Sequence, residues 1–322
     1  MLAAVYRRSG PAAEVLSVEE VPTPEPGPGE VRVRLRVAGV NPTDWKMRAA
    51  TTPPGAFQIP GQDGAGDIDA VGDGVDPARL GERVWVWFAA ARGRPWGTAA
   101  ACTVVPARQA VALPAEVSYD QGASLGIPAM TAWHCLFADG PLDGRTVLIT
   151  GGAGAVGNAA IALARRGGAR VLSTASTPDK AALALAAGAH VVVDYRVADA
   201  ADRLRTAAPD GVHRIVEVAL GANLPLSLAV VAPAGVICTY ANDPVDSLPV
   251  RALMEANLSL DFVLIYGVRD ADLDRAATGV REALAAGDLG VLPFIRFPLS
   301  RVAEAHDAVQ LGAAGKVLLD IG

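Results

Sequence analysis

The chain has 322 residues, 51% of them hydrophobic and 19% charged, which is enough apolar material for two full cores and excludes a disordered protein. The net charge of −6 disfavours a surface for nucleic acid or anionic membranes. Three cysteines far apart in the sequence suit a reducing compartment, and no stretch has the pattern of a secretory signal or a membrane span, so we expect a cytoplasmic protein.

The first part of the chain has the pattern of an all-β region. Short strand patterns separated by Pro and Gly extend over residues 1–124, and Glu30–Val40 alternates strictly, as a strand with one wet face does. The run Gly81–Phe88 is similar. After Ser118 the pattern changes, and helical periodicity covers Tyr119–Phe137.

Strand and helix patterns then alternate, which predicts a doubly wound parallel sheet. The strand-like runs are Thr146–Thr150, Arg170–Thr174, Val191–Asp194, Ile215–Val218, Val236–Tyr240 and Leu258–Ile265. Two helices, Asp272–Ala286 and Val302–Leu311, and a final strand follow. We therefore expect an α/β protein in which a β domain, residues 1–124 and 267–322, is interrupted by a nucleotide-binding domain, residues 125–266.

A glycine turn follows the first of these strands. Gly152, Gly154 and Gly157 satisfy the pattern G-x-G-x-x-G between a strand and a helix. Backbone N–H groups in such a turn approach a pyrophosphate closely, and the positive end of the helix dipole adds to the attraction. Tight packing of strand on helix explains many isolated matches, but here both flanking elements are predicted, which favours dinucleotide binding.

The end of the second strand indicates which dinucleotide binds. An NAD site places Asp or Glu there to accept hydrogen bonds from the ribose 2′-hydroxyl. This chain has Ala175, Ser176 and Thr177 instead, and Lys180 follows as a point charge for a 2′-phosphate. The expected role of the nearby Asp179 is to stabilise the first turn of the helix. The pattern favours NADPH.

Together these segments resemble the zinc-independent quinone oxidoreductases, the zeta-crystallin-like group of the medium-chain dehydrogenase/reductase superfamily. The resemblance runs essentially from end to end, through the segments GVNPTDWKMR, PGQDGAG, GERVWV, QGASLGIPAMTAWHCL, GGAGAVG, GAHVVVDYR and PLSRVAEAHDAVQLGAAGKVLL. It implies a GroES-like catalytic domain and a Rossmann domain, with NADPH in the cleft between them. It is specific for the family and much less so for the substrate.

The resemblance also assigns cofactor-binding residues by position. It implies that one set faces the pyrophosphate and a second surrounds the 2′-phosphate. In a third set, Thr131 reaches the nicotinamide ribose, the backbone of Phe262–Leu264 holds the carboxamide, and the other residues line the cofactor trough. In that order the sets are Ala153, Gly154, Ala155 and Val156; Ser176, Lys180 and Tyr195; and Thr131, Asn223, Tyr240, Ala241, Asn242, Phe262, Val263 and Leu264. Lys46 and Lys316 also fall at positions that approach the cofactor in the family.

A zinc ion is not expected. The related zinc alcohol dehydrogenases need a Cys after the alternating strand and a Gly-His-Glu segment, and those positions here hold Asn41 and the sequence Gly61-Gln62-Asp63. Asn and Gln are poor zinc ligands compared with thiolate and imidazole. Without a Lewis acid, an acceptor that takes hydride directly is the better substrate, such as a quinone or an α,β-unsaturated carbonyl.

The same two segments supply the candidate catalytic residues. Asn41 is predicted to donate an amide hydrogen bond to the acceptor carbonyl or to the cofactor. Lys46 either offers a proton or stabilises an oxyanion, or is simply an exposed lysine. Asp44 is expected to form a local turn bond. Gln62 lines the substrate site or, with Asp63, braces its loop.

Aromatic residues and an apolar edge complete the expectations. Trp45 and Tyr240 stand beside motif residues and are the best candidates for stacking on a planar acceptor. The apolar run Asn257–Gly267 is predicted to form an exposed edge of the nucleotide sheet, which favours a homodimer. Three functions stay open: an NADPH-dependent quinone reductase, an NADPH-dependent reductase of enones or 2-enoyl thioesters, and a low-turnover NADPH-binding protein.

Overall fold

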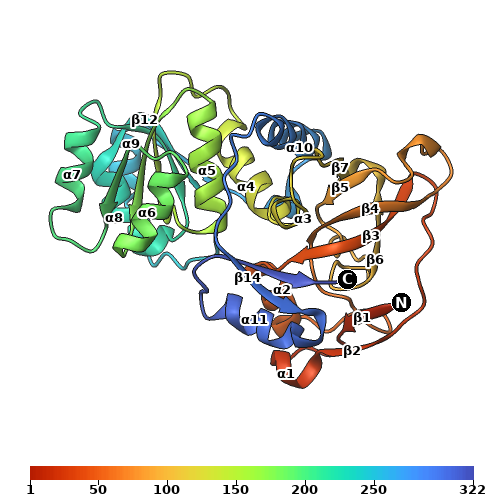
Figure 1. The fold of residues 1–322 in the computed structure, drawn as a ribbon. Helices are drawn as coiled ribbons and strands as arrows, with labels where there is room; N and C mark the ends of the chain where they lie inside the picture. Colours follow the sequence, from red (N-terminus) through yellow and green to blue (C-terminus); the bar gives the residue numbers. More distant parts are fainter. The chain divides into compact units, whose positions relative to one another are not determined.

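The computed structural model describes all 322 residues, and they form two compact units. Unit 1 comprises Met1–Ile127 and Pro293–Gly322, and unit 2 comprises Pro128–Leu292 (Figure 1). Both chain termini lie in unit 1. None of the helices combines the length and the apolarity that a membrane span requires.

Unit 2 begins near the predicted start of the nucleotide-binding domain, residue 125, and extends beyond its predicted end, residue 266. Residues 267–322 were all expected in the β domain, but residues 267–292 belong to unit 2. The reason is helix α10 (Asp270–Ala285), which packs against α5 (Ala155–Arg166) and passes so close to Trp133 that only a glycine fits at Gly279.

Unit 1 is built on short strands. The predicted alternation is present in the strand at Glu30–Gly39 but not at Arg83–Val86, where Val84, Trp85 and Val86 are all buried because both faces of that strand are covered. The strands are β1 (Leu2–Val5), β2 (Ser17–Glu20), β3 (Glu30–Gly39), β4 (Asp63–Val71), β5 (Arg83–Val86), β6 (Cys102–Pro106), β7 (Ala110–Ala112), β14 (Phe294–Pro298) and β15 (Lys316–Asp320). The larger sheet has the order β14-β15-β3-β4-β5-β7, with β6 also paired to β3. Its pairs are antiparallel except β14 with β15. In β3, Val31, Val33 and Leu35 face the core, and arginines stand between them.

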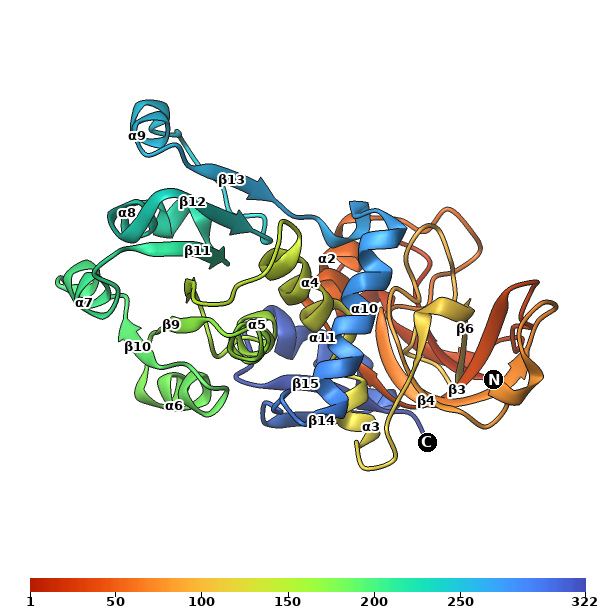
Figure 2. The ribbon, with the colours of Figure 1, turned by 90° about the horizontal axis from the view of Figure 1, so that it is seen from above.

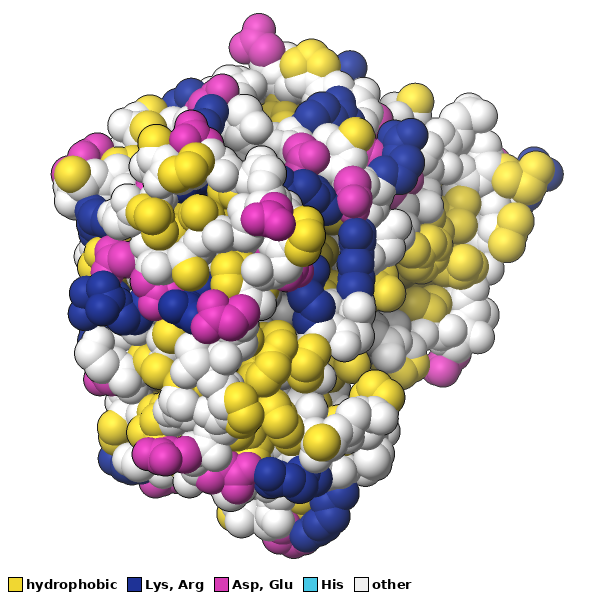
Figure 3. Space-filling model, turned by 90° about the vertical axis from the view of Figure 1, so that its right-hand side faces the viewer, with side chains coloured by type: hydrophobic (Ala, Val, Ile, Leu, Met, Phe, Trp, Pro, Cys, Tyr) yellow, Lys and Arg dark blue, Asp and Glu magenta, His cyan; other side chains and the backbone are white.

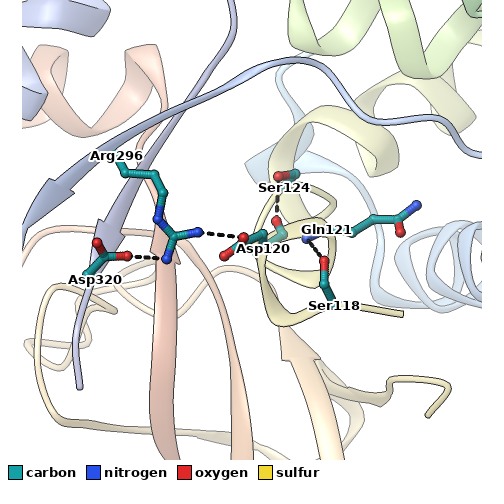
Figure 4. Close-up of polar contacts among 6 residues, drawn as sticks. All are labelled: Ser118, Asp120, Gln121, Ser124, Arg296 and Asp320. Atoms are coloured by element: carbon teal, nitrogen blue, oxygen red, sulfur yellow. Dashed lines mark hydrogen bonds and ion pairs between the residues drawn. The ribbon is translucent and has the colours of Figure 1, made fainter. Parts of the chain in front are cut away.

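Short helices connect these strands. They are α1 (Ala12–Val15), α2 (Pro42–Ala50), α3 (Tyr119–Gly122) and α11 (Val302–Gln310), with 3-10 turns η1 (Pro77–Arg79), η2 (Ala107–Gln109) and η4 (Leu299–Arg301). Arg296 on β14 donates to Asp120 on α3 and to Asp320 on β15, so the last strands of the chain are tied to a segment far away in sequence (Figure 4).

The single helix predicted over Tyr119–Phe137 is in fact two helices, α3 and α4 (Gly126–Phe137). The second helix begins where the Asp63 carboxylate accepts the N–H of Ile127, at 2.8 Å. A Cβ at Gly126 would lie 2.1 Å from that carboxylate. A side chain distant in sequence therefore sets the start of α4, which helical periodicity alone does not reveal.

Unit 2 is a doubly wound parallel sheet, as predicted. Its strands are β8 (Thr146–Ile149), β9 (Arg170–Ala175), β10 (Val191–Asp194), β11 (Val212–Glu217), β12 (Val231–Thr239) and β13 (Ser259–Phe262), in the order β10-β9-β8-β11-β12-β13. The other elements are α5, α6 (Pro178–Ala186), α7 (Ala200–Ala207), α8 (Leu220–Val230), α9 (Val250–Glu255), η3 (Ile265–Gly267) and α10. Helices α5 and α6 cover one face of the sheet and α7 and α8 the other (Figure 2).

This strand order reverses its direction between β8 and β11. The chain winds outward from β8 through β9 to β10, and then returns to β11 on the other side of β8. At such a reversal the connections leave in opposite directions, and open α/β sheets bind ligands there, beyond the carboxyl ends of the strands. Buried aliphatic residues from both halves, including Leu148, Ile215 and Ile237, form one core beneath that edge.

Candidate active site

The glycine turn lies at the reversal of strand order and opens α5. Gly151 has φ +67°, a left-handed conformation that glycine adopts without strain. Gly154 is the N-cap residue of α5, and no side chain caps the helix. The first N–H groups of the helix, beginning at Ala155, therefore have no helical or side-chain acceptor at its positive end. This is an anion-binding arrangement of the kind predicted.

The three motif glycines have different reasons to lack a side chain. A Cβ at Gly152 would lie 2.2 Å from the Ser173 hydroxyl, and one at Gly157 would lie 2.4 Å from the Gly151 carbonyl oxygen. Both glycines are required by packing. At Gly154 the nearest atom would be 3.4 Å away, an ordinary contact. Packing does not require a glycine there, whereas close approach of a pyrophosphate does. The turn therefore fits a dinucleotide.

A buried carboxylate connects this turn with the next one. Glu217, at the end of β11, is completely buried and accepts hydrogen bonds from the Thr150 hydroxyl at 2.9 Å and the Ala219 N–H at 2.7 Å. It also accepts from Asn223 Nδ2 at 2.8 Å and the Ser227 hydroxyl at 3.2 Å. All four donors are uncharged. Glu217 thus holds the first turn of α8 against the end of β8.

Sequence reasoning included Asn223 and missed Thr150 and Glu217. The available signal was a glutamate inside the predicted buried strand Ile215–Val218, since a carboxylate in such a strand needs several donors around it. Asn223 was expected to line the cofactor trough. Its amide is bonded to Glu217, so its side chain has a fixed orientation at this edge of the sheet.

The residues expected at the 2′-phosphate lie together at the ends of β9 and β10. Asp194 pairs in register with Ala175, so Tyr195 and Ser176 leave neighbouring strands at the same level. Tyr195 is exposed and Ser176 half-buried. Lys180 is exposed in the first turn of α6, where the Thr177 hydroxyl accepts its N–H. This edge combines hydroxyl groups with a lysine, as an NADPH site requires.

One acidic residue at the same edge is neutralised. Arg196 donates through Nε and Nη2 to Asp194, at 3.0 and 2.7 Å. These side-chain hydrogen bonds lower the pKa of Asp194 to about 2. Arg196 was not among the predicted residues, and it adds a second cation next to Tyr195. The sequence feature that could have identified Arg196 is its position directly after Tyr195 in the segment GAHVVVDYR.

The remaining cofactor candidates in unit 2 differ in exposure. Thr131 is buried in α4, Tyr240 and Ala241 are half-buried after β12, and Asn242 is exposed. Burial raises the pKa of the Tyr240 hydroxyl. In the run Phe262–Leu264, the outer two side chains are 68% and 70% exposed, and the Val263 N–H donates to the Thr239 carbonyl at 2.8 Å.

Unit 1 contains a buried polar network around Asn41. Lys316 Nζ donates to Asn41 Oδ1 at 2.7 Å, and Asn41 Nδ2 donates to Asp63 Oδ2 at 2.7 Å. Lys316 Nζ also lies 3.9 Å from the Asp63 carboxylate. The Asn41 N–H donates to Asp44 Oδ2 at 2.7 Å, which is the local bond expected of Asp44. We call these four residues the Asn41 network.

Burial shifts the titration of every ionisable member of this network. It raises the pKa of Asp44 to about 7 and that of Asp63 to about 6, and it lowers the pKa of Lys316. The Lys316 ammonium opposes both carboxyl shifts by attraction, and each carboxylate supports the charge on Lys316. Asp44 Oδ1 has no hydrogen-bond partner. Strongly shifted groups clustered in this way are typical of functional sites.

The structure separates the lysines that sequence reasoning grouped together. Lys316 was expected at the cofactor, but it is only 3% exposed and its ammonium is bonded to Asn41. Lys46 is exposed on α2, with its ammonium 5.8 Å from the centre of the half-buried Trp45 ring. Gln62 is buried, and its Oε1 has no hydrogen-bond partner. No three His, Cys, Asp or Glu side chains are grouped as metal ligands.

The Asp44 shift predicts an unusual dependence of stability on pH. Its pKa rises from 3.8 to about 7 on folding, so the folded state binds more protons between these values. The corresponding stability is present below pH 4 and is lost as the pH rises through 7. Between pH 5 and 7.5 the free energy of unfolding of wild type should fall by about 2 kcal/mol relative to Asp44→Asn. Urea unfolding at both pH values measures this.

An exposed carboxylate provides the control for that measurement. Asp210→Asn removes an exposed acid from the turn between α7 and β11 and should leave the pH dependence of wild type unchanged. Identical pH dependence in wild type and Asp44→Asn would show that the Asp44 carboxyl titrates normally in the folded protein.

Known proteins with similar sequences and structures support the same two-part organisation. The family model of the alcohol dehydrogenase GroES-like domain matches residues 27–115, and the one described as zinc-binding dehydrogenase matches residues 155–278. The quinone oxidoreductase of Rattus norvegicus is 31% identical over 324 aligned residues, covering 98% of this chain and 96% of that protein.

Two solved structures are similar over almost the whole chain. An NAD-dependent alcohol dehydrogenase has a TM-score of 0.90 at 28% identity, with 100% of both chains covered. A mycobacterial protein complexed with NADPH has a TM-score of 0.85 at 28% identity, with 99% of both chains covered. One of these two proteins is thus NAD-dependent, and the other binds NADPH.

Proposed function

The chain belongs to the quinone oxidoreductase family of the medium-chain dehydrogenase/reductase superfamily, and on that premise we propose that it is an NADPH-dependent quinone reductase that works without a metal ion. The observation that carries the proposal is the glycine turn, where Gly154 leaves room that packing does not require and the first amides of α5 have no cap. A pyrophosphate fits both features.

The preference for NADPH over NADH rests on the ends of β9 and β10. Ser176, Lys180 and Tyr195 offer two hydroxyl groups and an ammonium to a 2′-phosphate. The carboxylate nearest in register, Asp194, accepts three hydrogen bonds from Arg196, which makes it a weaker acceptor for a ribose 2′-hydroxyl. The NADPH complex of the mycobacterial structure supports this choice. The NAD-dependent relative has the same fold, so the cofactor preference depends on the residues at this edge and not on the fold alone.

Replacing Lys180 tests the cofactor preference. The change Lys180→Ala removes the ammonium proposed to bind the 2′-phosphate and should weaken NADPH about tenfold or more, because charge-assisted hydrogen bonds are worth about 1.5–3 kcal/mol. NADH lacks the phosphate and should bind as before. Fluorescence titration with both nucleotides measures the effect, with Arg251→Ala, an exposed charge on α9 away from that edge, as the control. Equal weakening of both nucleotides would remove the assignment.

In unit 1, Asn41 is proposed to meet the acceptor carbonyl. Lys316 occupies its oxygen and Asp63 accepts from its nitrogen, so the amide cannot flip without losing both bonds. One N–H of Nδ2 remains to donate to a carbonyl oxygen that gains negative charge as hydride arrives. A bound reduced nicotinamide would supply that hydride. Lys316 and Asp63 act as positioning residues through Asn41.

The same bonds support a reaction without metal. An asparagine stands where the zinc relatives need a thiolate, and both polar atoms of its side chain are engaged with Lys316 and Asp63. An amide held in this way is a poor ligand for zinc. Quinones accept hydride readily without Lewis-acid activation, and the hydroquinone is completed by one proton.

A panel of acceptors tests the proposed substrate class. Purified protein should oxidise NADPH with benzoquinones and naphthoquinones faster than with 2-enoyl thioesters or simple enones, measured as loss of nicotinamide absorbance. Faster turnover of 2-enoyl substrates would transfer the activity to enone reduction. Tight NADPH binding without turnover of any acceptor would mark a binding protein.

We also propose that the protein is a cytoplasmic homodimer. Strand β13 is the last strand of the unit 2 sheet, and apolar side chains near it are exposed, namely Leu248, Val250, Met254, Phe262 and Leu264. Hydrophobic side chains are gathered over this α9–β13 segment, at the right of the view in Figure 3. Pairing with a second copy would cover the edge. A mass equal to that of one chain, measured by light scattering, would refute the homodimer.

The proposed cytoplasmic location rests on the cysteines. The three free, buried thiols suit the cytoplasm.

A further inference from the structure

Unit 2 contains two cavities that the proposed reaction does not use. The larger, about 710 Å³, is a groove between α10 and the helices α4 and α5. We call it the α10 groove; Figure 2 shows these three helices side by side. The smaller, about 170 Å³, lies at the amino ends of the strands, and we call it the arginine pocket. Gly140 and Pro141 line both cavities, so the two adjoin.

The α10 groove has an aromatic floor. Trp133 and Phe137, one helical turn apart on α4, have ring centres 5.4 Å from each other. Two glycines bring the neighbouring backbone onto these rings. A Cβ at Gly279 would lie 2.0 Å from the Trp133 indole nitrogen, and one at Gly167 would lie 3.0 Å from the Phe137 ring. The volume is within the range of about 300–1,000 Å³ usual for small-molecule sites.

The charged groups on the groove do not favour a charged ligand there. Arg166 is paired with Asp288, and Arg275 is paired with Asp272. A further acid on α10, Glu282, stands on the same rim. An anionic group would therefore be repelled at this side of the groove, while an uncharged apolar body would be accepted over the rings.

The arginine pocket has the opposite character. Arg145 lines it and has no ion-pair partner within the chain. Arg214 is buried, and it donates to the Cys135 carbonyl at 2.7 Å and to Asp139, the acid that lines this pocket. His213 Nδ1 accepts the Thr146 N–H at 3.0 Å, so the neutral ring carries its hydrogen on Nε2, as a donor. Donors and a net positive charge favour an anion here.

We propose that the two cavities together bind an amphipathic carboxylate of the fatty-acid class. Its apolar chain lies over Trp133 and Phe137, and its carboxylate lies in the arginine pocket at Arg145. The apolar groove, the unpaired arginine and the shared wall at Gly140 and Pro141 select a ligand that is apolar along its length and anionic at one end. This site is independent of the proposed reaction.

Calorimetric titration of the full-length protein with dodecanoate, below the concentration at which it forms micelles, tests the proposal. Saturable binding is expected, stronger than that of octanoate because each buried methylene adds up to about fourfold in affinity. Arg145→Ala should weaken dodecanoate about tenfold. Thr278→Trp, which fills the α10 groove from an exposed helix position, should weaken it at least as much.

Two controls make the test decisive. Arg281→Ala removes an exposed charge from α10 outside the groove and should not alter binding. Dodecanol has the same chain without the carboxylate. It should bind wild type more weakly than dodecanoate does, whereas Arg145→Ala should bind the two ligands with equal affinity. Absence of saturable binding, or equal binding to wild type, Arg145→Ala and Thr278→Trp, would overturn the proposal. The thermal midpoint of each variant shows that it is folded.

Discussion

The substitution Gly154→Val is expected to weaken NADPH binding by at least about 100-fold while leaving the fold intact. A 100-fold loss of affinity corresponds to about 2.8 kcal/mol of binding free energy. A Cβ at position 154 would meet only one ordinary contact within the protein, and the backbone φ of −78° is one that valine adopts. The same side chain would occupy the space through which a pyrophosphate reaches the first amides of α5. Fluorescence titration and thermal unfolding measure the two effects separately.

The neighbouring glycine supplies a control with the opposite outcome. A Cβ at Gly157 would lie 2.4 Å from the Gly151 carbonyl, so Gly157→Ala should cost about 1–3 kcal/mol of stability through overpacking. The pair distinguishes a glycine required by a ligand from one required by packing. If Gly154→Val bound NADPH as tightly as wild type, the glycine turn would not be the pyrophosphate site.

The substitution Lys316→Met is expected to reduce the free energy of unfolding by about 3–5 kcal/mol at pH 8, the cost of leaving a buried charge without its partner. Asp63 would lose the ammonium 3.9 Å away, and Asn41 Oδ1 would lose its donor. Urea unfolding measures the loss. Lys46→Met is the matched control, because Lys46 is exposed and the same change there should stay within about 0.5 kcal/mol.

A second substitution tests whether the loss comes from the uncompensated charge. Adding Asp63→Asn to Lys316→Met removes the unpaired carboxylate and should restore part of the stability. The quinone reductase activity should not recover with it, because Asn41 still lacks the bond that orients its amide. Additive losses in the double variant would show that Lys316 and Asp63 do not interact.

The sequence predicts the parts of the molecule that depend on neighbours along the chain. The strand Val191–Asp194 lies where its β-branched run indicates, and the glycine turn lies between a strand and a helix because its flanking patterns are strong. Family membership likewise follows from motif order. Local patterns of this kind need no knowledge of what packs against them.

Features that depend on distant contacts were not predictable. Lys316 and Asn41 are 275 positions apart in the sequence. Neither segment by itself indicates that the Lys316 ammonium is buried against the Asn41 amide. The family resemblance placed Lys316 near the cofactor, and only the fold shows that its ammonium is bonded to Asn41. The break before α4 and the position of α10 have the same origin, since Asp63 and Trp133 act on segments remote in sequence.

The most direct test of the central claim is NADPH oxidation by a quinone after dialysis of the protein against a strong chelator, with NADPH deuterated at C4 as a second substrate. We predict turnover that the chelator does not reduce and that slows with the deuterated cofactor when hydride transfer limits the rate. At NADPH concentrations that do not saturate the variant, Gly154→Val should strongly reduce this turnover. Turnover that disappears with the chelator and returns with zinc, or that persists undiminished in Gly154→Val, would contradict the account.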